Sequence, residues 1–292
     1  MESVSTNVET FVNTIIQKYD IKDVKDHRCL YDMVKFSKPV KKNENNFNLL
    51  ISLYDEKNIK RAMELLYCLK ENYLVESIGS YYILLEKSEN SEYFIKRILN
   101  FFSHGNENVK ISTISQRPTF NSMFRFANEY IKGVVIMANS DIIFDETLHV
   151  LTKMKRDHFI TLTRYNHDGK LIKSVGKGTI NIFSQDTWIF HSPMTFSLNN
   201  SMDVGTFYSD SFMNYVLSQS NYKCFNLGKY IVSKHIQNDE SSSQHLDKFP
   251  GKKKEMVSYL KKTISDFDLA GIEMNHVNDF LENKNYNHFR KW

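Results

Sequence analysis

A continuous apolar run lies near the middle of the chain and ends abruptly at polar residues. Residues 134–138, Val-Val-Ile-Met-Ala, are followed directly by Asn139, Ser140 and Asp141. A short apolar run without alternation predicts a strand buried on both faces, which is typical of parallel sheets covered by helices. In open sheets of this kind, ligands bind beyond the carboxyl ends of the strands. We therefore expect the three polar residues at a ligand-binding edge.

Strands and helices alternate along the sequence that precedes this run. The predicted elements are strands at 47–54, 78–86 and 109–114 and helices at 55–75, 91–102 and 119–130. The helices are indicated by apolar residues that recur three and four positions apart. A β-α-β-α-β-α-β order predicts a parallel sheet with right-handed crossovers.

The rhythm changes after Asp145, which we interpret as the N-cap of a short helix that ends near residue 155. The elements predicted after it are a strand at 159–164, a hairpin turn at 167–169, strands at 184–190 and 222–233 and a helix at 210–217. The fold class expected from the whole pattern is α/β. A mostly parallel, Rossmann-like central sheet is flanked by helices, and the second half is mixed.

The two ends of the chain differ from this central region. Apolar residues between 8 and 19 form the stripe of an amphipathic helix, and the polar stretch 38–46 is typical of a linker. We expect an N-terminal helical appendage at 1–44, suited to packing or to homodimer formation, and a main domain at 45–250. Residues 251–292 form a basic and aromatic C-terminal extension with predicted helical character.

Composition narrows the class of protein. Of the 292 residues, 41% are hydrophobic, which is ample for a packed core, and the net charge of +4 is too small to indicate a nucleic-acid partner. Three scattered cysteines favour neither a disulfide framework nor a cysteine-rich zinc site. Neither a signal peptide nor an apolar run of about 20 residues, the length of a transmembrane segment, is evident, so we expect a cytoplasmic protein.

Known phosphate-binding loops are missing from the sequence. Neither G-x-G-x-x-G nor G-x-x-x-x-G-K-[ST] occurs, which argues against a dinucleotide-dependent dehydrogenase and against a P-loop enzyme. A carboxylate at the edge of the sheet offers another device, because a divalent cation held by it can bind a diphosphate. Asp141 is the candidate carboxylate, with Asn139 beside it and with His235, after a late predicted strand, as an imidazole ligand.

Four further residues are of types that bind a phosphate or a sugar or that act on a hydroxyl. Arg117 follows the third strand, where a guanidinium can engage a phosphate in bidentate fashion. Asp186 and Trp188 pair a carboxylate with an indole, which suits a sugar, although packing in the core is the preferred interpretation of the tryptophan. Asp210 starts a predicted helix, either as a cap or as a base for an attacking hydroxyl.

Several ordered blocks resemble the motifs of one family. The blocks are Arg117-Pro118-Thr119-Phe120, Ala127-Asn128, Asn139-Ser140-Asp141-Ile142, Thr161-Leu162-Thr163-Arg164 and Ser-Gln-Asp-Thr-Trp-Ile-Phe at 184–190. Together they resemble GT-A glycosyltransferase domains known from large DNA viruses, with relatives in plants and bacteria. The resemblance covers roughly residues 47–244. Two later family elements match in part: Gly205 and Asp210 keep their spacing, and His235 fits the first residue of a His-x-His element that has Gln237 in second place.

The resemblance implies transfer of a sugar from a nucleoside-diphosphate donor, UDP- or GDP-linked, to a hydroxyl of a glycan or glycoside acceptor. Mn²⁺ or Mg²⁺, held by Asp141 and His235, would act as a Lewis acid on the leaving diphosphate. The implied catalytic residues are Asp186 and Asp210. The implied donor-site residues are Ser52, Tyr54, Asp55, Arg117, Asn128, Asn139, Ser140, Arg164 and Trp188.

Two other functions stay open at the level of sequence. A catalytically silent carbohydrate- or nucleotide-binding module is suggested by the altered residues around Asp210. A sugar nucleotidyltransferase would share the parallel sheet and the metal but normally has a glycine-rich, basic loop after its first strand, and residues 52–57 contain no glycine. A methyltransferase is disfavoured for the same want of glycine in the first turn.

Overall fold

A computed structural model describes the central part of the chain. The described residues are 47–56, 58–101, 106–166, 169–170, 185–195, 203–205, 213, 216–217 and 220–236. The predicted N-terminal helix and linker, the C-terminal extension, residues 167–168 of the predicted hairpin turn and Asp210 lie outside them. The expected domain boundaries therefore stay predictions.

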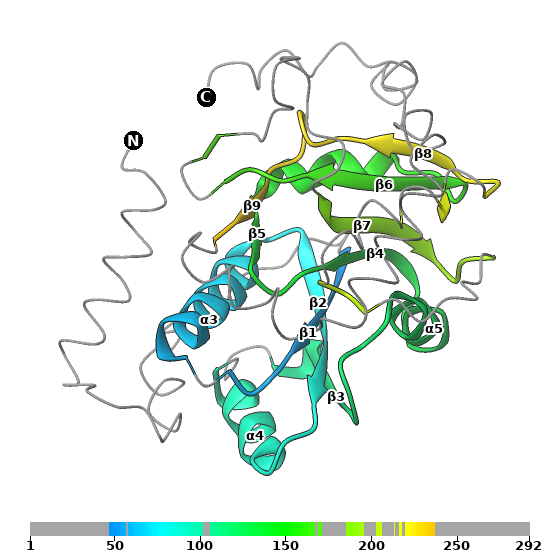
Figure 1. Cartoon of the computed structure of the whole chain (residues 1–292). Coiled ribbons are helices and arrows are strands. Elements are labelled where there is room, and N and C mark those ends of the chain that lie inside the picture. The colour runs from blue at the N-terminus through cyan, green and yellow to red at the C-terminus, as the bar shows by residue number, and fades with distance from the viewer. Residues whose placement is uncertain are drawn as a thin grey trace, which may run out of the picture.

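The described residues form a seven-stranded sheet with helices on both sides and a separate two-stranded sheet (Figure 1). The strand order of the large sheet is β3-β2-β1-β4-β7-β6-β8. Its strands are β1 (Phe47–Leu53), β2 (Ile78–Glu86), β3 (Val109–Ile114), β4 (Gly133–Ala138), β6 (His158–Thr163), β7 (Gln185–Ser192) and β8 (Lys223–Asn226). The helices are α3 (Ile59–Leu74), α4 (Ser91–Phe101) and α5 (Phe120–Tyr130), with short 3₁₀ segments η1 (Asn106–Asn108) and η2 (Glu146–Lys153).

The expected fold class is confirmed. Strands β3, β2, β1 and β4 pair in parallel, β7 is antiparallel to both β4 and β6, and β8 is parallel to β6. A mostly parallel sheet is thus followed by a mixed half, an arrangement consistent with a GT-A-like, Rossmann-type fold. No helix among the described residues is long and apolar enough to cross a membrane.

Strand β4 is covered on both faces, as its unbroken apolar sequence predicts. Ile136 and Ala138 belong to the core cluster that contains the buried side chains of α3 and α4. Val135 and Met137 face the opposite cluster, which contains the side chains of α5. Successive side chains of a strand point to opposite faces, so the two clusters are the two layers that enclose the sheet. In Figure 1, α3 and α4 lie on one side of the sheet and α5 on the other.

Capping residues set where the helices begin. Helix α5 starts after Thr119, whose side chain accepts from the Ser122 backbone N–H while the Ser122 hydroxyl reaches back to the cap, as in a capping box. Helix α3 starts four residues later than residue 55, where the sequence pattern predicts it. Its N-cap is Asn58, whose side chain accepts a hydrogen bond from the Arg61 N–H. Asp145 caps η2 through Thr147 N–H, as expected.

A two-stranded antiparallel ribbon joins the turn after β4 to the last part of the described chain. It consists of β5 (Ile142–Phe144) and β9 (Ser233–His235), and it pairs Ile142 with His235. The prediction of a strand over 222–233 is therefore right in part. The segment divides into β8, a turn and β9.

The turn between β8 and β9 requires a glycine at position 228. A Cβ atom built on Gly228 would lie 2.7 Å from the Thr163 carbonyl oxygen and 3.0 Å from the Thr163 nitrogen, both backbone atoms. The Gly228 N–H also donates to the Asn226 side chain at 3.1 Å, which draws the turn against β6. The close approach of two backbones explains why no side chain fits here.

We expect Gly228→Ala to lower the free energy of unfolding by about 1–3 kcal/mol, the usual cost of overpacking. Urea denaturation followed by circular dichroism measures it. Gly169→Ala is the control, because nothing lies within 4 Å of its Cβ position and only the strain of φ +78° opposes it. Equal losses in the two variants would show that the contact with Thr163 is not the cause.

Candidate functional site

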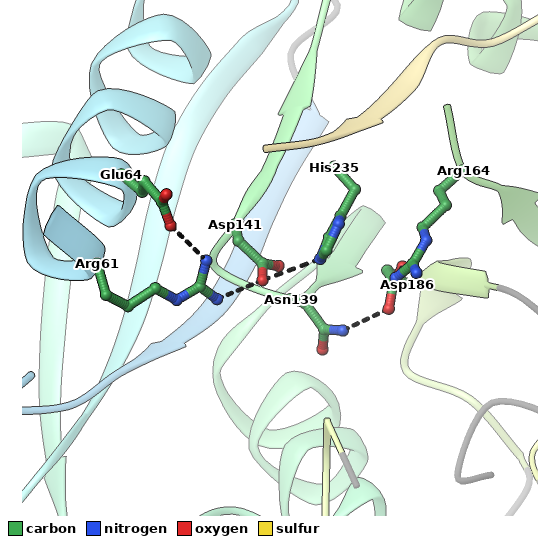
Figure 2. A network of polar contacts seen from close by, with 7 residues as sticks. All are labelled: Arg61, Glu64, Asn139, Asp141, Arg164, Asp186 and His235. Carbon is green, nitrogen blue, oxygen red and sulfur yellow. Dashed lines mark hydrogen bonds and ion pairs between the residues drawn. The ribbon is translucent and has the colours of Figure 1, made fainter. Parts of the chain in front are cut away.

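Polar side chains gather at one edge of the sheet because of the strand directions. Strand β7 is antiparallel to β4 and β6, so its first residues lie beside the last residues of both. Asn139 and Asp141 follow β4, Arg164 follows β6 and Asp186 lies at the start of β7. The structure thus brings together four residues that the sequence predicts at the site, and His235 joins them from β9 (Figure 2).

Asp141 lies at the centre of this edge and is only 5% exposed. Its Oδ2 accepts from Arg61 Nη2 at 2.5 Å and lies 3.1 Å from His235 Nε2. Its Oδ1 is buried and has no hydrogen-bond partner among the described residues. Backbone pairing fixes the contact with the histidine, because Ile142 pairs with His235 and the Ile236 N–H donates to the Asp141 carbonyl at 3.1 Å.

The charge of Asp141 is set by two opposing effects. Burial raises the pKa of this carboxyl, but the electrostatic interactions and hydrogen bonds with His235 and Arg61 outweigh burial and hold the pKa well below its ordinary value. Asp141 is therefore an anion, and among the described residues one of its two oxygens accepts no hydrogen bond.

Arg61 and Glu64 complete the cluster from helix α3, and sequence reasoning missed both. Arg61 is 8% and Glu64 is 9% exposed, and Arg61 Nη1 donates to Glu64 Oε2 at 3.0 Å. Figure 2 shows Arg61 reaching Asp141 from the helix, opposite His235, with Glu64 directed at the Arg61 guanidinium. Charged residues inside an amphipathic pattern are ordinarily assigned to the solvated face. A spacing of three residues matches the ion pair between Arg61 and Glu64, but nothing local indicates that they face the sheet.

Asp186 forms a second group beside the first. Its Oδ1 accepts from Asn139 Nδ2 at 2.7 Å, and its Oδ2 accepts from Arg164 Nη1 at 2.7 Å. The Asn139 N–H also donates to the Asp186 carbonyl at 3.0 Å. Both carboxylate oxygens are engaged, so in this arrangement Asp186 orients the two side chains that it contacts.

Arg117 connects the end of β3 with the segment 203–205. Its Nε donates to the Val204 carbonyl at 2.9 Å, and the Val204 N–H donates to the Pro118 carbonyl at 3.0 Å. A Cβ atom on Gly205, where φ is +70°, would lie 2.9 Å from Arg117 Nη2 and 3.8 Å from Asn139 Oδ1. Gly205 therefore lies against the same edge.

The remaining predicted donor-site residues occupy two kinds of position. Ser52 is half-buried near the end of β1, Tyr54 and Asp55 are half-buried just beyond it, and Ser140 is half-buried in the turn after β4. Burial, opposed by the charge of Arg61, raises the pKa of Tyr54 to about 12. These residues belong to the same edge of the sheet as Asp141.

Asn128 and Trp188 are not brought to this edge. The Asn128 side chain donates to the Met194 carbonyl and accepts from the Met194 N–H. Met194 follows the last residue of β7, which pairs with the first residue of β4. It therefore lies at the opposite edge and serves the chain turn there. Trp188 is 1% exposed and packs edge-on against Phe120, with ring centroids 4.7 Å apart, so it is the core residue that the sequence favours.

Asp141 and His235 could supply two ligands to a divalent cation, and its other ligands would then be substrate phosphates and water. The described residues contain no group of three or more histidine, cysteine, aspartate or glutamate side chains arranged around a common point. A carboxylate and an imidazole nevertheless lie side by side, with Asp141 Oδ2 and His235 Nε2 3.1 Å apart in a hydrogen bond, and both residue types are ligands of divalent ions. Magnesium commonly binds through one or two protein ligands, substrate phosphates and water.

Comparison with solved structures gives distant likenesses. The mannosyltransferase PcManGT from Pyrobaculum calidifontis, in complex with GDP-Man and Mn²⁺, is 9% identical with a TM-score of 0.46, over 83% of this chain and 72% of that one. GalNAc-T7 with UDP, GalNAc and Mn²⁺ is 10% identical with a TM-score of 0.45, over 77% of this chain and 52% of that one. The inositol-1-phosphate CTP transferase from T. maritima is 10% identical with a TM-score of 0.42, over 74% and 99%.

These likenesses include sugar transferases and a nucleotidyltransferase, and at TM-scores below 0.5 they do not decide between the two activities. No protein-family profile matches the chain, and no curated protein matches it. An activity for this chain has to be argued from its own residues.

Proposed function

We propose that the chain is a glycosyltransferase that moves a sugar from a nucleoside-diphosphate donor to an acceptor hydroxyl, with a divalent cation at Asp141. The observation that carries the proposal is the contact between Asp141 and His235, which are 94 residues apart, at the carboxyl edge of β4. The ordered motif blocks of the sequence support it. Five residues of those blocks, Arg117, Asn139, Asp141, Arg164 and Asp186, lie at the same edge of the sheet, and so does His235 from a later element that matches in part.

Asp141 and His235 would hold Mn²⁺ or Mg²⁺ against the donor diphosphate. The bound ion would supply Lewis-acid stabilisation of the charge that develops on the leaving diphosphate. Arg117 presents a guanidinium whose Nε donates to the Val204 carbonyl, and its Nη atoms are the proposed contacts of a phosphate. Ser52, Tyr54 and Asp55, at the end of β1, are the proposed contacts of the nucleoside.

The acceptor side of the proposal concerns Asp186 and Asp210. Asp186, with both oxygens engaged, would orient Asn139 and Arg164 next to the donor sugar. Asp210 is proposed as the group that orients or deprotonates the acceptor hydroxyl, on the resemblance alone.

The proposal is tested by thermal unfolding of the chain with UDP, GDP and their sugar conjugates, each with and without Mn²⁺. We expect one nucleotide series to raise the melting temperature only when Mn²⁺ is present, because the ion links the diphosphate to Asp141. Donor hydrolysis with the same nucleotide then measures turnover. Stabilisation without metal-dependent turnover, across donors and candidate acceptors, would favour the silent binding module, and no stabilisation by any nucleotide would contradict both.

A further inference from the structure

Arg61 contributes a fixed positive charge to the place where the proposed cation would bind. It is buried on helix α3, and its Nη2 lies 2.5 Å from Asp141 Oδ2, the oxygen that also faces His235 Nε2. Neither the motif blocks nor the proposed donor contacts include it. The carboxylate that would hold a divalent ion is therefore already paired with a guanidinium.

The charges around Asp141 leave little attraction for a free divalent ion. Among the described residues in contact there, Arg61 faces two carboxylates, those of Asp141 and Glu64. Its charge cancels one of the two negative charges. A divalent ion beside Asp141 would also be repelled by the guanidinium, and repulsion between charges about 4 Å apart is strong in a buried site of low effective dielectric constant.

We propose that Arg61 competes with the divalent cation for the Asp141 carboxylate, so that the cation enters the site together with the nucleoside diphosphate and not before it. The negative charge of the diphosphate offsets the positive charge of the Arg61 guanidinium. The guanidinium and the divalent ion can then both lie beside Asp141. This inference rests on the proposed function, because it concerns the same cation.

The competing role differs in its consequences from a purely structural one. If Arg61 only holds helix α3 against the turn after β4, its removal destabilises the chain and weakens cation binding, because Asp141 loses its orientation. If Arg61 competes, its removal strengthens cation binding in the absence of nucleotide. Removal of the Glu64 charge should have the opposite effect and weaken cation binding. The Glu64 carboxylate contacts Arg61, so without its negative charge the guanidinium repels the ion more strongly.

The experiment measures Mn²⁺ affinity by electron paramagnetic resonance of the free ion, without nucleotide and with UDP or GDP. The proteins compared are the wild type, Arg61→Gln, Arg61→Lys, Glu64→Gln and Asp141→Asn, the last as the control that removes the ligand. Without nucleotide we expect Arg61→Gln to bind Mn²⁺ about tenfold or more tightly than the wild type, since one repelling unit charge is lost. Arg61→Lys should stay at the wild-type affinity, and Glu64→Gln should bind more weakly.

Melting curves accompany each titration, because Arg61→Gln leaves two buried carboxylates without their partner. A cooperatively melting Arg61→Gln variant that binds Mn²⁺ no more tightly than the wild type would overturn the competition. If that variant does not fold, Glu64→Gln decides, and an affinity equal to that of the wild type would overturn it. If no protein binds Mn²⁺ even with UDP or GDP, the cation site itself fails, and the proposed function fails with it.

Discussion

Replacement of Asp141 by asparagine is expected to reduce metal-dependent donor turnover by about a thousandfold or more, because the amide retains the shape of the side chain but offers no anionic oxygen to the cation. The substitution also removes the charge from the buried Oδ1 of Asp141, which has no hydrogen-bond partner in the described part of the chain. The rate of release of nucleoside diphosphate with saturating donor and Mn²⁺ measures the effect. The loss should not be rescued by more Mn²⁺.

Asp145→Asn is the matched control, since this aspartate lies four residues further along the chain, just after β5. Asp145 is exposed, and its Oδ1 accepts from the Thr147 N–H at 3.0 Å as the cap of η2. We expect little change in stability, because asparagine and aspartate cap helices about equally well, and no change in turnover. Turnover that survives in Asp141→Asn would remove Asp141 from the proposed role.

The second large effect is expected for Asn72→Ala, measured as the free energy of unfolding. Asn72 is 3% exposed, its Nδ2 donates to the Ile142 carbonyl at 2.8 Å and its Oδ1 accepts from the Phe144 N–H at 2.9 Å. Alanine would leave both backbone groups of β5 buried without partners, at a cost of about 1–3 kcal/mol for each group left unsatisfied. We expect a total loss of about 3 kcal/mol in urea denaturation.

Asn48→Ala provides the comparison. Asn48 also bonds two backbone groups, the carbonyls of Lys132 at 3.1 Å and Val134 at 3.0 Å, but it is only half-buried and lies at the other edge of the sheet. Water can replace its hydrogen bonds, so the expected loss is about 1 kcal/mol. Mn²⁺ binding should fall in Asn72→Ala and not in Asn48→Ala, because only Asn72 holds the ribbon that carries His235. Equal losses of stability would contradict the argument from burial.

Local patterns predict the central sheet well because its strands are short and apolar. The predicted strands at 78–86 and 109–114 coincide with β2 and β3, and β4 differs from its prediction by one residue. Strands β2 and β4 are mostly buried and contain few polar residues, so their limits coincide with changes of polarity, whereas β3 lies at the edge of the sheet and contains exposed polar residues. Helix α3 was predicted to begin too early, because Asp55 and Glu56 are compatible with a first turn and the cap is Asn58.

The sequence predicts those residues of the candidate site that directly follow a predicted strand. The positions of Asn139, Asp141 and Arg117 follow from the rule that ligands bind at the carboxyl ends of parallel strands. Pairing of side chains across the fold is different. Arg61 lies 80 residues from Asp141 and is buried because it pairs with that carboxylate. The residue pattern of helix α3 gives no sign of this partner. The hydrogen bonds from Asn139 and Arg164 to Asp186 could not be predicted either. The order of the strands in the sheet, not the spacing in sequence, makes these residues neighbours.

The ribbon of β5 and β9 attaches residue 235 to the turn after β4 through main-chain hydrogen bonds. Its register therefore does not depend on which side chain occupies that position. Substitution of residue 235 alone would therefore change the ligand type, and with it the metal preference, of the proposed cation site. A carboxylate there would favour oxygen-seeking ions such as Mg²⁺, and a thiolate would favour softer ones such as Zn²⁺.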